Sequence, residues 1–350
     1  MTHELKTGGD RGYLRIATEE AFAVREVIDA YLRMVRDGTA DKGTRSLWGF
    51  YATSTSERAQ LIMDRLLDLG ERRIADMDAT GIDKALLLLT APGVNPFEAD
   101  VARALSVSAN DELAEAVARH PSRLAGLAAF APQDPHWSAE EIRRGKEELG
   151  FVGVMVNSHT QGHYLDEPRF DPILRAIAEA GQVLYIHPQS PPDAMIGPMV
   201  DAGLDGAVFG FGVEVAFHAL RLITSGVFDR YPDLQLMIGH GGEAIPYWLY
   251  RMDYMHNAGV RSQRYKRIKP LNRPFAQTVR ENLLVTTSGM PAPASTKLCI
   301  DVMGEDRVLY AMDYPYQYVA DEVRMHDTLD ISDAAKKKLM QTNAERWFKL

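Results

Sequence analysis

Residues 308–316, VLYAMDYPY, decide the fold. The stretch begins with apolar strand formers, and the strand is expected to stop at Asp313 because Tyr314 and Pro315 turn the chain away. An acidic side chain placed where a buried strand ends is typical of the catalytic edge of an α/β barrel. An aspartate before a proline can also simply cap a turn, so this stretch alone leaves a structural role open.

Three other runs of strand formers end in a carboxylate or an imidazole. They are residues 16–20 (IATEE), 184–188 (LYIHP) and 236–240 (LMIGH). Neighbouring residues of a strand point to opposite faces, so at most one of the two glutamates looks inward, and Glu19 is preferred to Glu20. The four endings together predict a metal site at the mouth of a barrel.

Eight apolar runs alternate with helical patterns along the chain. The runs show no alternation of polar and apolar residues, as is typical of strands buried on both faces of a parallel sheet. The pattern predicts an α/β fold, a (β/α)8 TIM-like barrel, in a single domain spanning residues 1–350. The expected strands are residues 14–18, 82–90, 124–131, 152–157, 183–187, 234–240, 282–287 and 308–313.

Three segments are predicted to lie outside the repeating pattern. Residues 1–12 are expected to form a flexible polar tail, and residues 23–55 to be an irregular insertion loop at the barrel mouth. Residues 189–215 are rich in Gly and Pro and are expected to form a long loop over the mouth.

Composition narrows the classes of function. The chain has 350 residues and a formal net charge of −9, which argues against a nucleic-acid surface. No stretch reaches the ~20 apolar residues that span a membrane. The single cysteine, Cys299, excludes a Cys-based zinc site within one chain and fits a reducing compartment, so a cytoplasmic location is expected.

Several of these motifs resemble the amidohydrolase superfamily, and within it the branch of metal-dependent, non-oxidative aromatic decarboxylases. The motifs are residues 17–22 (ATEEAF), 185–188 (YIHP), 218–222 (HALRL), 239–243 (GHGGE), 286–289 (TTSG) and 312–315 (MDYP). They extend over nearly the whole chain. The resemblance implies an amidohydrolase-type barrel that holds a metal with Glu19, His187 and Asp313.

One position departs from the wider superfamily. Hydrolytic members usually begin with H-x-H and some decarboxylases keep E-x-H, whereas this chain has Ala21 at the second histidine position. The remaining oxygen-rich ligand set suits Mn²⁺ better than Zn²⁺, which is kept as the alternative metal. This departure favours decarboxylation over hydrolysis.

The resemblance also implies a reaction, the conversion of 5-carboxyvanillate to vanillate and CO₂ without an organic cofactor. Asp313 is expected to deliver a proton to the ring carbon that loses CO₂, and His240 with Glu243 to orient or protonate the substrate hydroxyl. Expected substrate contacts are Tyr51, Arg58, Arg251 and His218, with a packing role equally open for His218. Relatives build part of the mouth from a neighbouring subunit, so a homo-oligomer, dimer or tetramer, is expected.

Other readings remain open. Decarboxylases of the 2,3-dihydroxybenzoate or γ-resorcylate type come next in order of preference. A metal-dependent hydrolase or hydratase of a lactone or dicarboxylate would consume water and release no CO₂. A barrel with an inert site that serves as a binding subunit is disfavoured by the retained Glu19, His187, His240 and Asp313.

Overall fold

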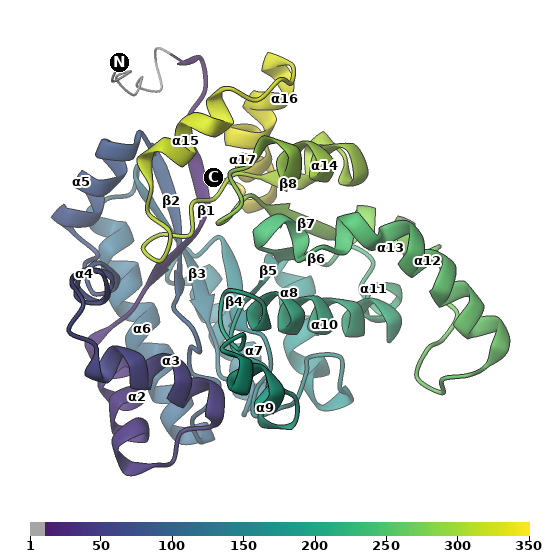
Figure 1. Cartoon of the computed structure of the whole chain (residues 1–350), viewed down its shortest axis with the longest axis horizontal. Helices are drawn as coiled ribbons and strands as arrows, with labels where there is room; N and C mark the ends of the chain where they lie inside the picture. Colours follow the sequence, from purple (N-terminus) through teal and green to yellow (C-terminus); the bar gives the residue numbers. More distant parts are fainter. Residues whose placement is uncertain (1–10) are drawn as a thin grey trace.

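A computed structural model describes residues 11–350 and contains eight parallel strands that neighbour one another in sequence order (Figure 1). The backbone N–H of Thr18 donates to the carbonyl of Tyr310 at 3.0 Å and joins the first strand to the segment after the last. The (β/α)8 barrel is therefore confirmed. The strands are β1 (Ile16–Phe22), β2 (Lys84–Leu89), β3 (Leu124–Ala129), β4 (Gly153–Asn157), β5 (Val183–His187), β6 (Gln235–Ile238), β7 (Leu283–Thr286) and β8 (Val308–Leu309).

Helices connect successive strands and surround the barrel (Figure 1). In the first half of the chain they are α2 (Arg25–Asp37), α3 (Lys42–Thr53), α4 (Glu57–Leu66), α5 (Glu71–Thr80), α6 (Ala99–Arg119), α7 (Pro135–Glu147) and α8 (Asp171–Ala180). In the second half they are α9 (Asp193–Ala202), α10 (Gly210–Thr224), α11 (Val227–Arg230), α12 (Ile245–Ser262), α13 (Phe275–Asn282), α14 (Pro293–Met303), α15 (Ala320–Asp327), α16 (Asp333–Lys337) and α17 (Asn343–Phe348). No helix in residues 11–350 is long and apolar enough to cross a membrane.

The first and last strands differ from their predicted bounds. β1 continues to Phe22, paired with β2, and so contains both Glu19 and Glu20. β8 is only two residues long, and the amide of Tyr310 donates to the carbonyl of Leu339 at 2.9 Å instead of extending the ladder. Asp313 therefore lies in a loop four residues beyond the strand, and not at the last strand position.

The predicted irregular loop at residues 23–55 is wrong, because the segment folds into α2 and α3. Its apolar residues recur at helical spacing, and Tyr31 is buried with its ring 4.6 Å from that of Trp48. Trp48 Nε1 donates to the carbonyl of Ala91 at 3.1 Å and fastens the insertion to the end of β2. Residues 189–215 likewise contain α9 and the start of α10, and α2, α3 and α9 lie together at the bottom of Figure 1.

The predicted flexible tail, residues 1–12, lies almost entirely outside the described residues. At its end, Arg11 forms an ion pair with Asp83, so the described part of that segment contacts the barrel.

Candidate metal centre and active site

The strand ends predicted to carry the chemistry meet in the structure. Within residues 11–350, one group of ligand atoms lies within 4.8 Å of one another, and it comes from Glu19, His240 and Asp313. His187 Nε2 lies 3.9 Å from Glu19 Oε1, and His240 Nε2 lies 3.8 Å from the same oxygen. The sequence predicts His187 as the imidazole ligand, whereas the three-residue group contains His240 in its place.

Glu19 has the surroundings of a cation ligand. Its side chain is 1% exposed, and Oε2 accepts a hydrogen bond from Thr286 Oγ1 at 2.9 Å. Oε1 is buried without a hydrogen-bond partner among the described residues, and it faces the two imidazoles. An unsatisfied buried carboxylate oxygen is costly unless a cation or proton satisfies it. Carboxylate and imidazole donors are also the ligands that Mn²⁺ accepts, so the residues present fit this metal.

Both histidines are held so that Nε2 faces Glu19. His187 Nδ1 lies 2.8 Å from Asn157 Oδ1, and His240 Nδ1 lies 2.7 Å from Glu243 Oε1. An acceptor at Nδ1 places the proton there and leaves Nε2 free as a ligand or base. The structure thus brings His240 and Glu243 together as the expected pair, and it adds Asn157, which sequence analysis did not single out.

The ionisable groups of the site shift one another's pKa values strongly. Burial raises the pKa of Asp313 to about 8, and the nearby carboxylate of Glu19 adds to this rise against the attraction of His240. Burial would lower the pKa of His240, but the carboxylates of Glu243 and Glu19 outweigh it and raise the pKa to about 10. Three carboxylates around one imidazole are the surroundings in which an additional positive charge is favoured.

Backbone conformations of the left-handed region cluster at the same place. Asp313 has a φ of 76°, while His240 and Glu243 have φ values of 50°. Non-glycine residues adopt this region at a cost, and they do so mostly where the surrounding structure holds them for function. Both loops that carry these residues are therefore shaped by their contacts and not by local preference.

The predicted substrate contacts Arg58 and Tyr51 lie on the helices that follow β1. Arg58 is exposed, and its Nη2 donates to the carbonyl of Tyr316 at 2.7 Å. Tyr51 is half-buried, with its ring 5.5 Å from that of Trp48. Tyr316 also shares a hydrogen bond between its hydroxyl and that of Thr90. Sequence analysis assigned no role to Tyr316 or Thr90, although Thr90 ends one predicted strand and Tyr316 follows another.

His218 lies in a buried polar cluster instead of the metal group. Its Nε2 accepts a hydrogen bond from the Leu165 amide at 3.1 Å, and Nδ1 lies 3.4 Å from Ser158 Oγ. Burial lowers the pKa of His218 to about 3, so the ring is neutral. With no exposed surface and both nitrogens occupied, His218 fits the packing role and does not fit substrate contact.

Arg251 lies on α12, which projects from the right side of the molecule in Figure 1. Its side chain is exposed and makes no hydrogen bond or ion pair with any residue from 11 to 350. Within its own chain, therefore, the structure does not join Arg251 to the metal group.

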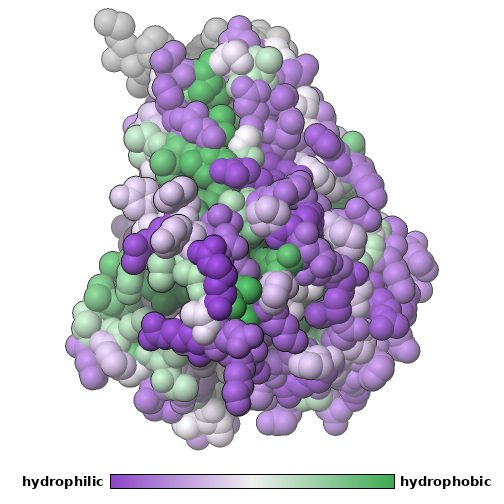
Figure 2. Space-filling view, turned by 90° about the vertical axis from the view of Figure 1, so that its right-hand side faces the viewer, coloured by the Kyte–Doolittle hydropathy of each residue, from purple (hydrophilic) through white to green (hydrophobic). Residues whose placement is uncertain are grey.

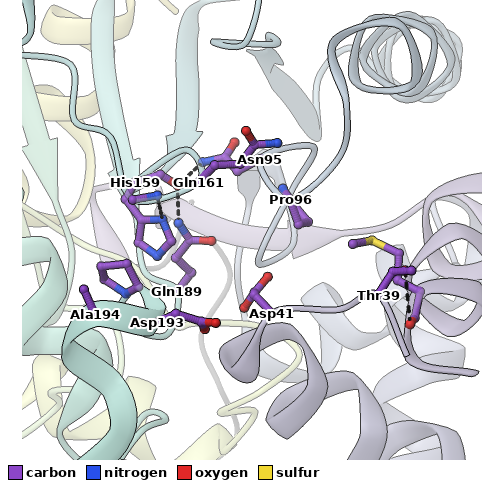
Figure 3. Close-up of a pocket in the computed structure, with 12 residues that line it drawn as sticks. Thr39, Asp41, Asn95, Pro96, His159, Gln161, Gln189, Asp193 and Ala194 are labelled. Atoms are coloured by element: carbon purple, nitrogen blue, oxygen red, sulfur yellow. Dashed lines mark hydrogen bonds between the residues drawn. The ribbon is translucent and has the colours of Figure 1, made fainter. Parts of the chain in front are cut away.

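A cavity of about 350 Å³ lies beside the site, between the end of α2 with the loop that follows it, the start of α9 and the loops after β2, β4 and β5 (Figure 3). Asp41, Asp193, Asn95 and Gln189 line it, and none of the four strand-end residues does. It reaches the site only indirectly, because Asn95 donates to the backbone of Asn157, the partner of His187. The cavity is thus a neighbour of the metal group and not the group's own pocket.

Fold and site define a metal-dependent barrel enzyme. Residues 54–350 match the amidohydrolase family model, and the chain belongs to this family. It is 37% identical over 300 residues to γ-resorcylate decarboxylase of Polaromonas sp. strain JS666, covering 83% of this chain and 90% of the relative.

Two solved structures are similar over nearly the whole chain. One is 5-carboxyvanillate decarboxylase of Novosphingobium aromaticivorans with manganese and 4-hydroxy-3-methoxy-5-nitrobenzoic acid, at 66% identity, TM-score 0.99 and full coverage of both chains. The other is 5-carboxyvanillate decarboxylase of Sphingomonas paucimobilis, at 38% identity and TM-score 0.91, covering 97% of this chain and 99% of the other.

Proposed function

We propose that this protein is a manganese-dependent decarboxylase that converts 5-carboxyvanillate to vanillate and CO₂. The observation that carries the proposal is the convergence of Glu19, His240 and Asp313, with His187 beside them, at the mouth of a barrel. The 66% identity to a manganese-containing 5-carboxyvanillate decarboxylase supports the same substrate.

Glu19, His187 and Asp313 would hold the metal in this proposal, with His240 facing them from the segment after β6. When bound, Mn²⁺ supplies a Lewis acid for the carboxylate and the ortho-hydroxyl oxygen of the substrate. The unsatisfied Oε1 of Glu19 supports this assignment. His240, oriented by Glu243, would orient the substrate hydroxyl or hold its proton through Nε2.

Asp313 carries the proton step. Its carboxyl group delivers a proton to the ring carbon that bears the departing carboxylate, so that a C–H bond forms there. The C–C bond then breaks, its electron pair restores the aromatic ring, and CO₂ leaves. Asp313 regains a proton from water, so the reaction consumes one proton in total and needs no redox cofactor.

Arg58 is proposed to bind the second carboxylate of the substrate, the one that remains in vanillate. A guanidinium group can hold a carboxylate by two parallel hydrogen bonds, and Arg58 is exposed beside Tyr51 and the Tyr316 carbonyl. Monocarboxylates such as 2,3-dihydroxybenzoate or γ-resorcylate would leave this arginine unpaired, and for that reason they rank second.

A homo-oligomer assembled through α12 is also proposed. This helix exposes four aromatic residues, with Tyr247 71%, Trp248 52%, Tyr250 85% and Tyr254 59% exposed. Aromatic residues and arginine are enriched at protein interfaces, and Arg251 lies among them without a hydrogen-bond or ion-pair partner in the described part of its own chain. Figure 2 looks onto this projecting side, where the surface is mostly hydrophilic and hydrophobic groups gather toward the left. Arg251 would then reach the site of the second copy.

A cytoplasmic location completes the proposal. The single cysteine, Cys299, is buried and free, and burial raises the pKa of its thiol to about 11. An unpaired, unreactive thiol agrees with a reducing compartment.

An ultraviolet absorbance assay with measurement of released CO₂ tests the reaction. Mn²⁺-loaded protein would be offered 5-carboxyvanillate, 2,3-dihydroxybenzoate and γ-resorcylate in parallel, with chelator-treated protein as the control. We expect turnover of 5-carboxyvanillate by the loaded protein alone. Turnover of only a monocarboxylate would refute the substrate, and no CO₂ from any of the three would refute decarboxylation and direct attention to lactones.

A further inference from the structure

Glu20 points away from the metal group and holds the loop that carries Asp313. The pairing of β1 with β2 shifts its register between Ala17 and Glu20, and the hydrogen bonds place Glu19 toward the site and Glu20 toward the segment after β8. Glu20 Oε1 accepts a hydrogen bond from the Met312 amide at 3.0 Å, and Oε2 accepts one from the Tyr314 amide, also at 3.0 Å. The side chain is 2% exposed, so these bonds are shielded from water.

The two amides that Glu20 binds lie on either side of Asp313. The loop has left the sheet at Leu309, so neither amide has a strand partner. Asp313 itself has a φ of 76°, which a non-glycine residue keeps only when its surroundings impose it. A third bond, from the Ala21 amide to the Tyr314 carbonyl at 2.7 Å, joins the same loop to the same strand.

Arg73 lies near Glu20, but its side-chain hydrogen bonds go to backbone carbonyls and not to the carboxyl oxygens of Glu20. Its guanidinium group is buried and donates to the carbonyls of Ala21 and Arg65, and its charge centre lies 4.7 Å from the ring centre of Tyr314. The positive charge is therefore close by, while both oxygens of Glu20 remain bound to the loop. Bonds between a carboxylate and amide N–H groups are stronger than neutral ones.

We propose that Glu20 is a positioning residue that fixes the backbone of Asp313 and so aims its carboxylate at the metal and the substrate ring. The inference rests on the proposed function only in taking Asp313 as a metal ligand and proton donor. One carboxylate of β1 would serve the metal directly, and its neighbour would serve it through the loop after β8. Residues that hold ligands in place typically contribute about 10–100-fold to metal affinity or activity.

A double-mutant cycle read by Mn²⁺ affinity tests the role. Calorimetry would measure Mn²⁺ binding to the wild type, Glu20→Gln, Asp313→Ala and the double variant. Glutamine keeps the shape of Glu20 but turns an NH₂ group toward one of the amides. We expect Glu20→Gln to lower the Mn²⁺ affinity about 10–100-fold. In the Asp313→Ala background the same change should lower it no further, because Glu20 affects the metal only through Asp313.

An equal loss in both backgrounds would overturn the proposal, since it would mean general loosening of the barrel; an unchanged affinity of Glu20→Gln would overturn it as well. Glu141→Gln is the matched control, because Glu141 is a buried carboxylate on α7 bound to Asn110 and Arg144, and its loss should leave Mn²⁺ affinity within about twofold. Should Glu20→Gln not fold, Glu20→Asp takes its place, because aspartate keeps the carboxyl group and shortens its reach.

The metal readout separates this inference from the proposed substrate. If the wild type decarboxylates none of the acids offered, the cycle still decides whether Glu20 acts through Asp313. If the wild type is active, Glu20→Gln assayed at saturating Mn²⁺ should lose kcat by about 10–100-fold while KM changes less than about threefold, because substrate binding residues are untouched. A KM effect as large as the kcat effect would contradict a role confined to Asp313.

Discussion

At the scale of single residues, the site is built around one carboxylate oxygen, Glu19 Oε1, which two imidazole rings face. His187 and His240 approach Glu19 Oε1 to 3.9 Å and 3.8 Å, and Asp313 Oδ2 lies 4.0 Å from His240 Nε2. These separations are too long for hydrogen bonds and leave room between the groups. A cation held by Glu19, His187 and Asp313, with His240 beside it, would offset the negative charge that gathers there.

Asp313→Asn tests the proton donor. Asparagine keeps an oxygen for the metal but carries no acidic proton, so kcat for 5-carboxyvanillate should fall by at least ~10³-fold. The measurement is product formation together with the Mn²⁺ content of the purified variant. Near-normal rates in a variant that retains the metal would show that another group protonates the ring.

Arg58→Ala tests the binding of the second carboxylate. A paired charged hydrogen bond is worth roughly 1.5–3 kcal/mol, so KM for 5-carboxyvanillate should rise about 10–100-fold. KM for 2,3-dihydroxybenzoate, if it is turned over, should change less than about threefold on the same argument. Arg58→Lys keeps the charge without the planar fork, so its KM for 5-carboxyvanillate should lie between those of the wild type and Arg58→Ala. Equal changes for both acids would remove Arg58 from the substrate site.

At the scale of elements, α10 is fastened to the end of β4 by a buried polar cluster. Glu214 accepts hydrogen bonds from Ser158 Oγ at 2.9 Å and from the Tyr164 hydroxyl at 3.1 Å, and His218 lies beside them. Burial raises the pKa of Glu214 to about 7, although these two donors oppose the rise. Ser158 directly follows Asn157, the residue that orients His187, so the cluster helps to hold the segment that positions His187.

Glu214→Gln should remove a pH dependence of stability. The folded pKa is raised above the ordinary value of 4.5, so the folded state binds the proton more tightly, and stability falls as the pH rises from about 4.5 to about 7. Between pH 5 and pH 8 the wild type should lose ~2–3 kcal/mol relative to Glu214→Gln, whose side chain cannot ionise. Chemical denaturation of both proteins at several pH values measures this, and parallel curves would contradict it.

At the scale of the whole molecule, α12 stands out because it extends beyond the barrel with its aromatic side chains exposed (Figure 1). A monomer would leave these aromatic side chains in water, whereas a twofold contact between copies would cover them and bring each Arg251 toward the other subunit. The proposed assembly and the proposed role of Arg251 therefore both depend on a contact between copies through α12.

Mixed oligomers test whether Arg251 acts across the interface. Asp313→Asn and Arg251→Ala are each expected to be inactive, but a dimer that contains one of each has a single site with both residues intact. Coexpression should therefore restore about a quarter of wild-type activity, since half of randomly formed dimers are mixed and each has one working site of two. No restoration in dimers shown to be mixed would place Arg251 in its own subunit's site.

Much of the fold could be predicted because it depends on local patterns. Apolar runs of β2 and β5, bounded by glycine and proline, indicated the buried strands of a parallel barrel, and the structure confirms their order. The helices after β1 differ from the predicted irregular loop because Val27 and Tyr31, at helical spacing, are buried on one face of α2. Tertiary contacts, such as Trp48 to the Ala91 carbonyl, place those helices.

The sequence by itself determined the barrel and the set of ionisable residues at its mouth, because strand-end residues of a (β/α)8 barrel necessarily gather at one edge. Only the tertiary structure decided which of them meet and which do not. It grouped His240 with Glu19 and Asp313, buried His218 elsewhere, and gave Glu20 the amides around Asp313. Such pairings depend on side-chain direction and loop path, which are set by packing between segments far apart in the chain.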